Sequence, residues 1–259
     1  MDEICEQSIR YAVLGIEISG ITRKSFFDEI DRKLQANSRY VEPLFVVTVN
    51  PEIVVQSITD SEFRRVLWSS AINTADGVGI SWAVRRMYGA KIERITGSDS
   101  LEEICQLAAR HGSSVFFYGA RPGVAEKTAA ILSERIQGLI VAGSFSPDRP
   151  DLPLEEHPES VQEALRSAAI VFVALGAPHQ EKWIHRNIKN LPSCKLIIGI
   201  GGSFDFIAGT AKRAPLFFRR TGTEWIYRLV KQPSRWRRML RLPLFALNVL
   251  LMQSKSVRR

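Results

Sequence analysis

Short apolar runs rich in β-branched and aromatic residues recur along the chain and alternate with segments of helical periodicity. Two segments predict helices, at 123–137 and 158–168. Alternation of strands and helices is typical of βαβ units, and runs that are apolar throughout indicate strands covered on both faces. We therefore expect an α/β fold, Rossmann-like, with a largely parallel sheet flanked by helices. The predicted strands are 44–50, 114–120, 139–143, 169–178 and 195–202.

The length, the cysteines and the N-terminal residues are those expected of an intracellular globular protein. The 259 residues suffice for one large domain or for a domain with an appendage. Three cysteines, Cys5, Cys105 and Cys194, are too few and too far apart for a disulfide framework or a CxxC metal site. The first ten residues are acidic and lack the apolar segment of a signal peptide, so we expect a cytoplasmic protein. Residues 146–160, with four prolines, predict a surface loop.

The net charge of +8 conceals two unlike parts. Residues 211–259 hold thirteen lysines and arginines and one acid, a net charge of +12, whereas residues 1–210 hold 22 basic and 26 acidic residues, a net charge of −4. We divide the chain accordingly into an α/β core, 1–210, and a basic appendage, 211–259. Such asymmetry favours an anionic partner for the appendage, either nucleic acid or a membrane surface.

The pattern of the appendage favours the membrane. Residues 223–252 interleave basic and apolar residues as an interfacial helix does, with Trp236, Leu240 and Phe245 as apolar anchors. The apolar run 242–252 is shorter than the roughly 20 residues that cross a bilayer, and an arm that binds nucleic acid has no use for it. We expect an anionic inner-membrane surface as partner and no nucleic acid. The plain alternative is a solvated helix with one core face.

Several predicted strands end in small or polar residues. Ligands of open parallel sheets bind beyond the carboxyl ends of the strands, so we expect the functional site along that edge. Glycines that merely turn the chain are the alternative. The residues at these ends are Thr48, Asn50, Gly119, Gly176, Gly201 and Gly202.

Common cofactor and nucleotide motifs are absent or imperfect. The stretch GIGGSFDF (199–206) approaches a dinucleotide fingerprint, but Phe204 occupies the place of its third glycine, which argues against a nicotinamide or flavin enzyme. Neither a P-loop nor a GxSxG elbow occurs. The chain has no Asp-x-Asp, and its four histidines lack metal-ligand spacing. We therefore expect no metal and no bound cofactor.

Asp76, in the stretch NTADGVGI (73–80), is an acid within an otherwise apolar and glycine-rich segment. Asp is a preferred N-cap, so it could begin a helix at Gly77. It could also be a reactive carboxylate, because a partly apolar pocket raises the pKa of an acid and makes it a better base.

Six motifs in a fixed order give the chain a family resemblance. It resembles the WecG/TagA/CpsF family of bacterial glycosyltransferases from about residue 12 to 240. The motifs are TVNPEIV (48–54), ADGVGI (75–80), RITGSD (94–99), FFYGARPGV (116–124), VALGAPHQEKWI (173–184) and the long segment 199–238 that begins with GIGGSFDF.

The resemblance implies an activity. The family transfers a sugar from a UDP-sugar to an undecaprenyl-diphosphate-linked acceptor in surface polysaccharide synthesis, with inversion and without a metal. The missing Asp-x-Asp agrees with this. N-acetylmannosamine, its uronic acid and glucuronate are all conceivable donor sugars. The resemblance also implies attachment to the cytoplasmic face of the inner membrane, and a homo-oligomer is possible.

The resemblance also implies roles for particular residues. Asp76 falls on the family's general base, and Thr48 and Arg94 are expected to act with it. Asn50 and Gln180 fall on motif positions of the family and are expected to bind substrate. The glycine-rich segments at and beyond the strand ends add Gly77, Gly119, Gly201, Gly202 and Ser203 as expected substrate-binding residues. Arg228, Arg235 and Arg238 fall on arginines that reach toward the lipid diphosphate and the membrane.

Each role has a plainer alternative. Thr48 could be an ordinary strand residue, Arg94 could pair at the surface with Glu93 or Asp99, and Gln180 could be a helix N-terminal residue beside Glu181. For the whole chain, the rivals are a non-catalytic nucleotide-sugar-binding sensor and a nucleic-acid-binding protein with a basic C-terminal arm.

Overall fold

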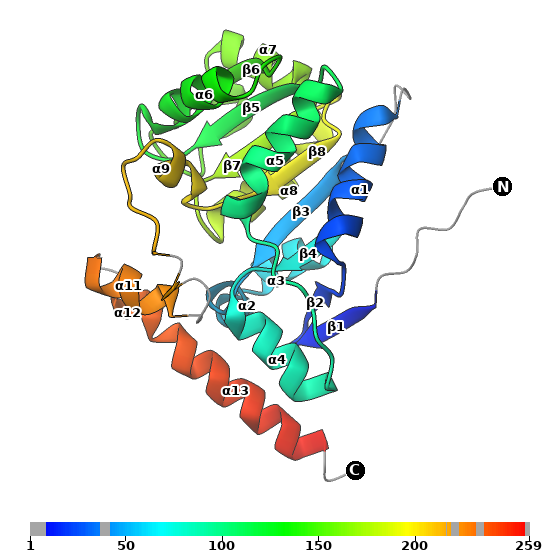
Figure 1. The fold of residues 1–259 in the computed structure, drawn as a ribbon, viewed down its shortest axis with the longest axis vertical. Coiled ribbons are helices and arrows are strands. Elements are labelled where there is room, and N and C mark those ends of the chain that lie inside the picture. Colours follow the sequence, from blue (N-terminus) through cyan, green and yellow to red (C-terminus); the bar gives the residue numbers. More distant parts are fainter. Residues whose placement is uncertain (1–8, 37–41, 216, 219–222, 232–235, 257–259) are drawn as a thin grey trace, which may run out of the picture.

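A computed structural model describes residues 9–36, 42–215, 217–218, 223–231 and 236–256. Six parallel strands form one sheet in the order β4-β3-β8-β7-β5-β6 (Figure 1). The α/β fold with a parallel sheet is therefore confirmed. The strands are β3 (Leu44–Val49), β4 (Ile72–Ala75), β5 (Ser114–Gly119), β6 (Ile140–Phe145), β7 (Ile170–Ala174) and β8 (Leu196–Gly199).

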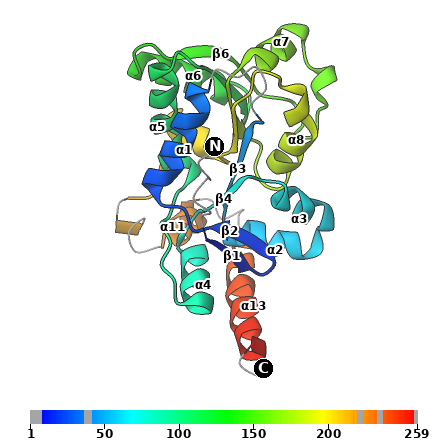
Figure 2. The ribbon, with the colours of Figure 1, turned by 90° about the vertical axis from the view of Figure 1, so that its right-hand side faces the viewer.

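Helices cover both faces of this sheet, as Figure 2 shows. Alternate residues of each central strand point to opposite faces, so the chain has two apolar clusters, one on each side. One face is covered by α1 (Arg23–Gln35), α5 (Gly97–Arg110), α6 (Val124–Arg135) and α9 (Ser203–Ile207). The other is covered by α2 (Pro51–Thr59), α3 (Ser61–Trp68), α4 (Val78–Tyr88), α7 (Glu159–Ser167) and α8 (His179–Asn187).

Three details differ from the sequence prediction. An antiparallel hairpin of β1 (Arg10–Val13) and β2 (Ile16–Ser19) precedes the sheet; Leu14 and Gly15 turn it with φ of 51° and 87°, as a tight hairpin requires. Strand β4 was not predicted, because it has only four residues and two of them are polar. Strand β6, at one edge of the sheet, is half-buried rather than covered on both faces.

The prediction of a surface loop at 146–160 is only partly right. Leu154 and His157 are buried, beside the short 3-10 helix η1 (Leu154–Glu156). Burial lowers the pKa of His157 and so favours a neutral ring. Its Nδ1 can then donate to the Pro153 carbonyl at 2.7 Å while Nε2 accepts from the Tyr118 hydroxyl at 2.8 Å. These contacts hold the loop against β5. A second 3-10 helix, η2 (Ile188–Asn190), follows α8.

The described part of the appendage includes the helices α11 (Glu224–Lys231), α12 (Trp236–Met239) and α13 (Arg241–Ser256). Helix α13 packs against α2 and α4 (Figure 1). Phe245 and Val249 of α13 are 2% and 0% exposed and belong to the apolar cluster of that sheet face. Phe245 is therefore a core residue, and its prediction as a membrane anchor is wrong.

The opposite side of α13 is an exposed leucine stripe. Leu240, just before the helix, and Leu244, Leu247 and Leu251 within it follow one another at spacings of four, three and four residues, so they share one helix face. Each is between 46% and 57% exposed. No helix in the described stretches is long and apolar enough to cross a membrane.

Truncating Phe245 tests whether the appendage folds with the core. Phe245→Ala is expected to lower the free energy of unfolding by about 3 kcal/mol, because it leaves a cavity in the cluster that α13 shares with the sheet. Urea denaturation measures this, with Leu247→Ala on the exposed stripe as control, expected within about 0.5 kcal/mol of wild type. If α13 alone became protease-sensitive while the main transition stayed unchanged, the appendage would be an independent unit. The boundary at 210/211 stays a prediction until then.

Candidate active site

A cavity of about 1150 Å³ opens at the carboxyl ends of β3, β4, β7 and β8. Residues of α11, α12 and α13 of the same chain form part of its wall. This is the edge of the sheet at which the sequence predicts ligand binding. Ten of the predicted site residues line the cavity: Thr48, Asn50, Asp76, Gly77, Arg94, Gln180, Gly201, Gly202, Ser203 and Arg238.

Three predicted site residues are not placed at the cavity: Gly119, Arg228 and Arg235. Gly119 does not line the cavity, and its role there is not supported. Its φ is +104°, and a Cβ would lie 2.8 Å from the Ala174 carbonyl carbon, so tight packing of β5 against β7 accounts for the glycine. Arg235 and the side chain of Arg228 lie outside the described residues.

Asp76 follows β4 directly and is half-buried at the cavity. Its backbone N–H donates to the Val49 carbonyl at 2.7 Å, which fixes the chain beside the end of β3. The N-cap residue of α4 is Gly77, with φ of 95°. The N-cap alternative for Asp76 is therefore wrong, and a glycine is needed after it because side chains disfavour this positive φ.

Arg94 is placed beside Asp76 by backbone pairing. The Ile95 N–H donates to the Ala75 carbonyl at 3.0 Å, and Ala75 and Arg94 form an isolated parallel bridge. Thr74 reinforces this by donating from its hydroxyl to the Ile95 carbonyl at 2.9 Å. The bridge brings the chain segment of Arg94 next to the end of β4. A carboxylate and a guanidinium thus come from adjacent segments at the same cavity.

Thr48 and Asn50 leave β3 at the same edge. The buried Thr48 hydroxyl donates to the Gly199 carbonyl at 2.9 Å, so its hydrogen is used between β3 and β8 and its oxygen is left to accept. Asn50 caps α2, with Oδ1 accepting from the Ile53 N–H at 3.0 Å. Both residues line the cavity, but each has a structural task as well, and their substrate contacts stay a prediction.

Gln180 and Ser203 also have structural partners. Gln180 Oε1 accepts from the N–H groups of Gly176 and Gly201, at 3.2 and 3.0 Å. The Ser203 hydroxyl donates to the Ile200 carbonyl at 2.6 Å. These side chains therefore shape the loops after β7 and β8 that form the cavity floor.

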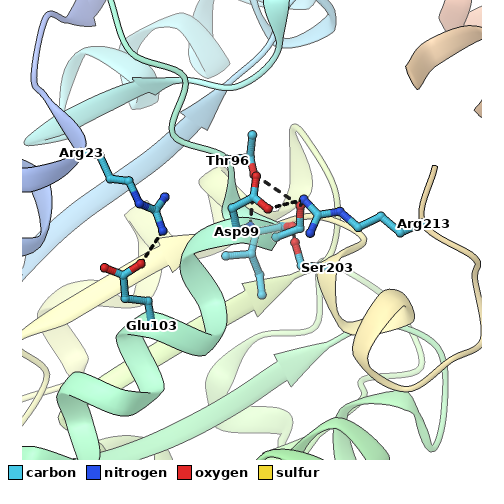
Figure 3. Close-up of polar contacts among 8 residues, drawn as sticks. Arg23, Thr96, Asp99, Glu103, Ser203 and Arg213 are labelled. Carbon is cyan, nitrogen blue, oxygen red and sulfur yellow. Dashed lines mark hydrogen bonds and ion pairs between the residues drawn. The ribbon is translucent and has the colours of Figure 1, made fainter. Parts of the chain in front are cut away.

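One ion-pair cluster at the cavity was not predicted. Arg213, in the segment after α9, reaches the N-terminus of α5 (Figure 3). There it donates to Asp99 Oδ1 at 2.5 Å and to the Ser98 hydroxyl at 3.1 Å. Asp99 also accepts at 2.8 Å from the hydroxyl of Thr96, the N-cap of α5. The segment from 199 to 238 carried the resemblance, but only the fold shows that Arg213 meets a residue 114 positions earlier.

The appendage is tied to the start of α2. Arg238 donates through Nε to Glu52 Oε2 at 2.8 Å, and Arg241 donates to Gln56 Oε1 at 3.0 Å. Arg238 lines the cavity, so the basic appendage contributes a cation to the mouth of the site. In the described parts of the chain, no three His, Cys, Asp or Glu side chains gather as metal ligands would.

Glu181 is a fully buried acid next to Gln180, and its environment predicts a pH effect on stability. Burial raises its pKa from 4.5 to about 7, against the opposing hydrogen bond from Gln180. The folded protein therefore holds this proton more tightly than the unfolded chain, so the Glu181 contribution to the free energy of unfolding falls as pH rises from about 4.5 to 7.

This effect is measurable against a variant that cannot titrate. Between pH 5 and 8, wild type is expected to lose up to about 3 kcal/mol of stability relative to Glu181→Gln, from the size of the shift. Urea denaturation of both proteins at each pH gives the difference and cancels the titration of all other groups. Parallel pH dependences of the two proteins would contradict the raised pKa.

The chain is similar to known proteins over most of its length. The chain matches the glycosyl transferase WecG/TagA/CpsF family over residues 11–259. It is 38% identical over 205 residues, 79% of this chain and 78% of the relative, to an N-acetylglucosaminyldiphosphoundecaprenol N-acetyl-beta-D-mannosaminyltransferase of Bacillus subtilis. A protein of the same name from Bacillus spizizenii is 36% identical over 208 residues, 80% of this chain and 78% of the relative. The chain therefore belongs to the WecG/TagA/CpsF family and is a glycosyltransferase.

Proposed function

We propose that this enzyme transfers N-acetylmannosamine from its UDP-sugar to N-acetylglucosamine linked to undecaprenyl diphosphate, with inversion at the anomeric carbon. The names of the two Bacillus relatives support the choice of sugar and acceptor. The uronic acid of N-acetylmannosamine and glucuronate are the next donors to test. The product would enter cell-surface polysaccharide synthesis.

The observation that carries the mechanism is the pairing of the Asp76 and Arg94 segments at one cavity. Asp76 takes the proton from the acceptor hydroxyl as its oxygen attacks the anomeric carbon from the face opposite the UDP. The bond from that carbon to the diphosphate oxygen breaks, and its electron pair leaves with UDP. Arg94 stabilises the negative charge that develops there. One displacement of this kind inverts the anomeric centre.

The acceptor is proposed to approach past the appendage. Arg238 offers a cation to the lipid diphosphate, and the leucine stripe of α13 offers an apolar face to the membrane from which a lipid-linked substrate would come. We place the enzyme peripherally on the cytoplasmic face of the inner membrane, where anionic headgroups attract basic residues.

The test is UDP release by purified enzyme, with a panel of UDP-sugars, the lipid-linked acceptor, and parallel reactions in EDTA. Acceptor-dependent release with UDP-N-acetylmannosamine that persists in EDTA is the expected result. Release only with another UDP-sugar would change the donor. Loss in EDTA would show that a metal is needed. UDP binding without turnover on any donor would favour the nucleotide-sugar sensor. Nuclear magnetic resonance of the product gives its anomeric configuration and so tests inversion.

The leucine stripe makes a separate prediction. Leu244→Ser combined with Leu247→Ser is expected to weaken binding to vesicles with anionic lipids about thirtyfold or more, since each leucine loses at least about 1 kcal/mol of apolar transfer. Vesicle co-sedimentation measures this, with Ile140→Ser, an exposed apolar residue on β6, as the matched control. Unchanged vesicle binding in the double variant, with UDP release intact, would contradict membrane docking through this face.

A further inference from the structure

Glu181 is the most deeply buried acid near the active site, and the proposed chemistry does not use it. It lies in the first turn of α8 with 0% of its surface exposed. Its Oε1 accepts from Gln180 Nε2 at 2.6 Å, and its Oε2 has no hydrogen-bond partner among the described residues. A buried acid with so few partners is costly, so its retention calls for a task that an apolar residue would not perform.

The Gln180 amide, which Glu181 contacts, indicates what this task is. Gln180 Oε1 accepts from two backbone N–H groups, that of Gly176 in the loop after β7 and that of Gly201 in the loop after β8. These loops belong to different βα units and both line the cavity. Gln180 thus joins them across the cavity floor, which requires that its oxygen, and not its NH₂ group, face the two glycines.

Glu181 favours that orientation of the amide. Glu181 Oε1 can accept whether the carboxyl is ionised or carries its proton on Oε2. It binds the Gln180 NH₂ group and leaves the amide oxygen to the glycines. The amide also has little room to move. A Cβ on Gly199 would lie 2.7 Å from Gln180 Nε2, so the amide rests directly on the end of β8. The carbonyl of the same glycine accepts from the Thr48 hydroxyl, which extends the network to β3.

We propose that Glu181 is a positioning residue of the transferase: its carboxyl orients the Gln180 amide, and the amide holds the glycine loops after β7 and β8 in the geometry that binds the UDP-sugar. This inference rests on the proposed function. It assigns Gln180 a role through its hydrogen bonds to the loops, in addition to any contact with substrate. The donor side of the cavity should therefore depend on Glu181, whereas acceptor binding beside the appendage should not.

An exchange of the two side chains tests this directly. Glu181→Leu removes the oxygen that binds the Gln180 NH₂ group. We expect it to raise KM for the UDP-sugar about tenfold, by the loss of one buried hydrogen bond, and to leave KM for the lipid-linked acceptor unchanged. Gln180→Glu sets two acids against each other and should be worse. In Q180E/E181Q the acid at position 180 accepts from Gly176 and Gly201, and the amide at position 181 donates to it. We expect this double variant to recover at least about tenfold in kcat/KM over Gln180→Glu alone.

A second measurement does not depend on turnover. Amide hydrogen exchange at Gly176 and Gly201, followed by nuclear magnetic resonance, should speed up at least tenfold in Glu181→Leu and return toward wild type in the double variant. Asn187→Leu is the matched control: it removes a buried polar side chain from the other end of α8, whose Nδ2 donates to the Trp183 carbonyl. It should lower Tm without changing exchange at the two glycines.

The outcomes separate this inference from the proposed function. If wild type releases no UDP on any acceptor while exchange responds as expected, the transferase proposal fails and the orienting role of Glu181 stands. If wild type turns over and Glu181→Leu leaves exchange and KM for the UDP-sugar within twofold, the positioning role is overturned. A double variant no better than Gln180→Glu, although folded by circular dichroism, would show that the Gln180 amide acts on substrate and not through the loops.

Discussion

Asp76→Asn is expected to lower kcat for sugar transfer about 10²- to 10⁴-fold, the range that a positioned general base supplies. Asn has nearly the same shape as Asp but cannot take the proton of the acceptor hydroxyl. Asp76 does not cap α4, since Gly77 occupies that position, so the exchange should leave the helix intact. UDP binding, measured by titration calorimetry, should stay within about twofold, because the base acts on the acceptor and not on the nucleotide.

Asp205→Asn is the matched control for this prediction. Asp205, on α9, lines the same cavity and pairs with Arg121 at 3.1 Å. That ion pair is partly exposed and comes from other segments than the Ala75–Arg94 bridge. We expect its effect on kcat to be below about tenfold, as for most partly exposed ion pairs. Equal losses of kcat in the two variants would show that only the negative charge in the cavity matters, and that Asp76 does not act as a general base. Full activity in Asp76→Asn would exclude it as the base.

The location of the site was predictable because it depends on a property of all open parallel sheets. Polar and glycine residues that end predicted strands must meet at one edge, and Thr48, Asn50 and Gly201 do so. Gly119 satisfies the same pattern but serves close packing against Ala174. A glycine after a strand is therefore ambiguous in the sequence, because close backbone approach and ligand contact demand the same absence of a side chain.

What the sequence did not reveal depends on contacts between distant segments. Arg213 belongs by composition to the basic appendage, yet it pairs with Asp99 of the core. Phe245 has the pattern of a membrane anchor, yet it is buried beside α2 and α4, while the leucines on the other side of α13 are exposed. Periodicity defines two apolar faces on this helix but not which one meets the core. Likewise, nothing local to Glu181 indicates that it is fully buried.

Arg94→Gln is expected to reduce kcat about 10²- to 10³-fold, comparable to the loss of one preorganised group that stabilises developing charge. The backbone bridge to Ala75 fixes the Arg94 segment before substrate arrives, so the guanidinium needs little reorganisation as the bond to UDP breaks. KM for the UDP-sugar should change less than kcat, because the charge grows in the transition state. Arg94→Lys keeps the positive charge but lacks the planar guanidinium with its paired N–H donors. We therefore expect its loss of kcat to be smaller than that of Arg94→Gln.

Steady-state kinetics on the Arg94 variants distinguish transition-state from ground-state roles. Arg110→Gln removes one positive charge from the far end of α5, outside this cavity, and should leave kcat and KM unchanged; it thereby controls for net charge. A large rise in KM with kcat preserved would mean that Arg94 binds the diphosphate equally in ground and transition states. In that case the charge that develops on the leaving UDP must be stabilised by another cation lining the cavity, and Arg238 of the appendage would be the first to examine.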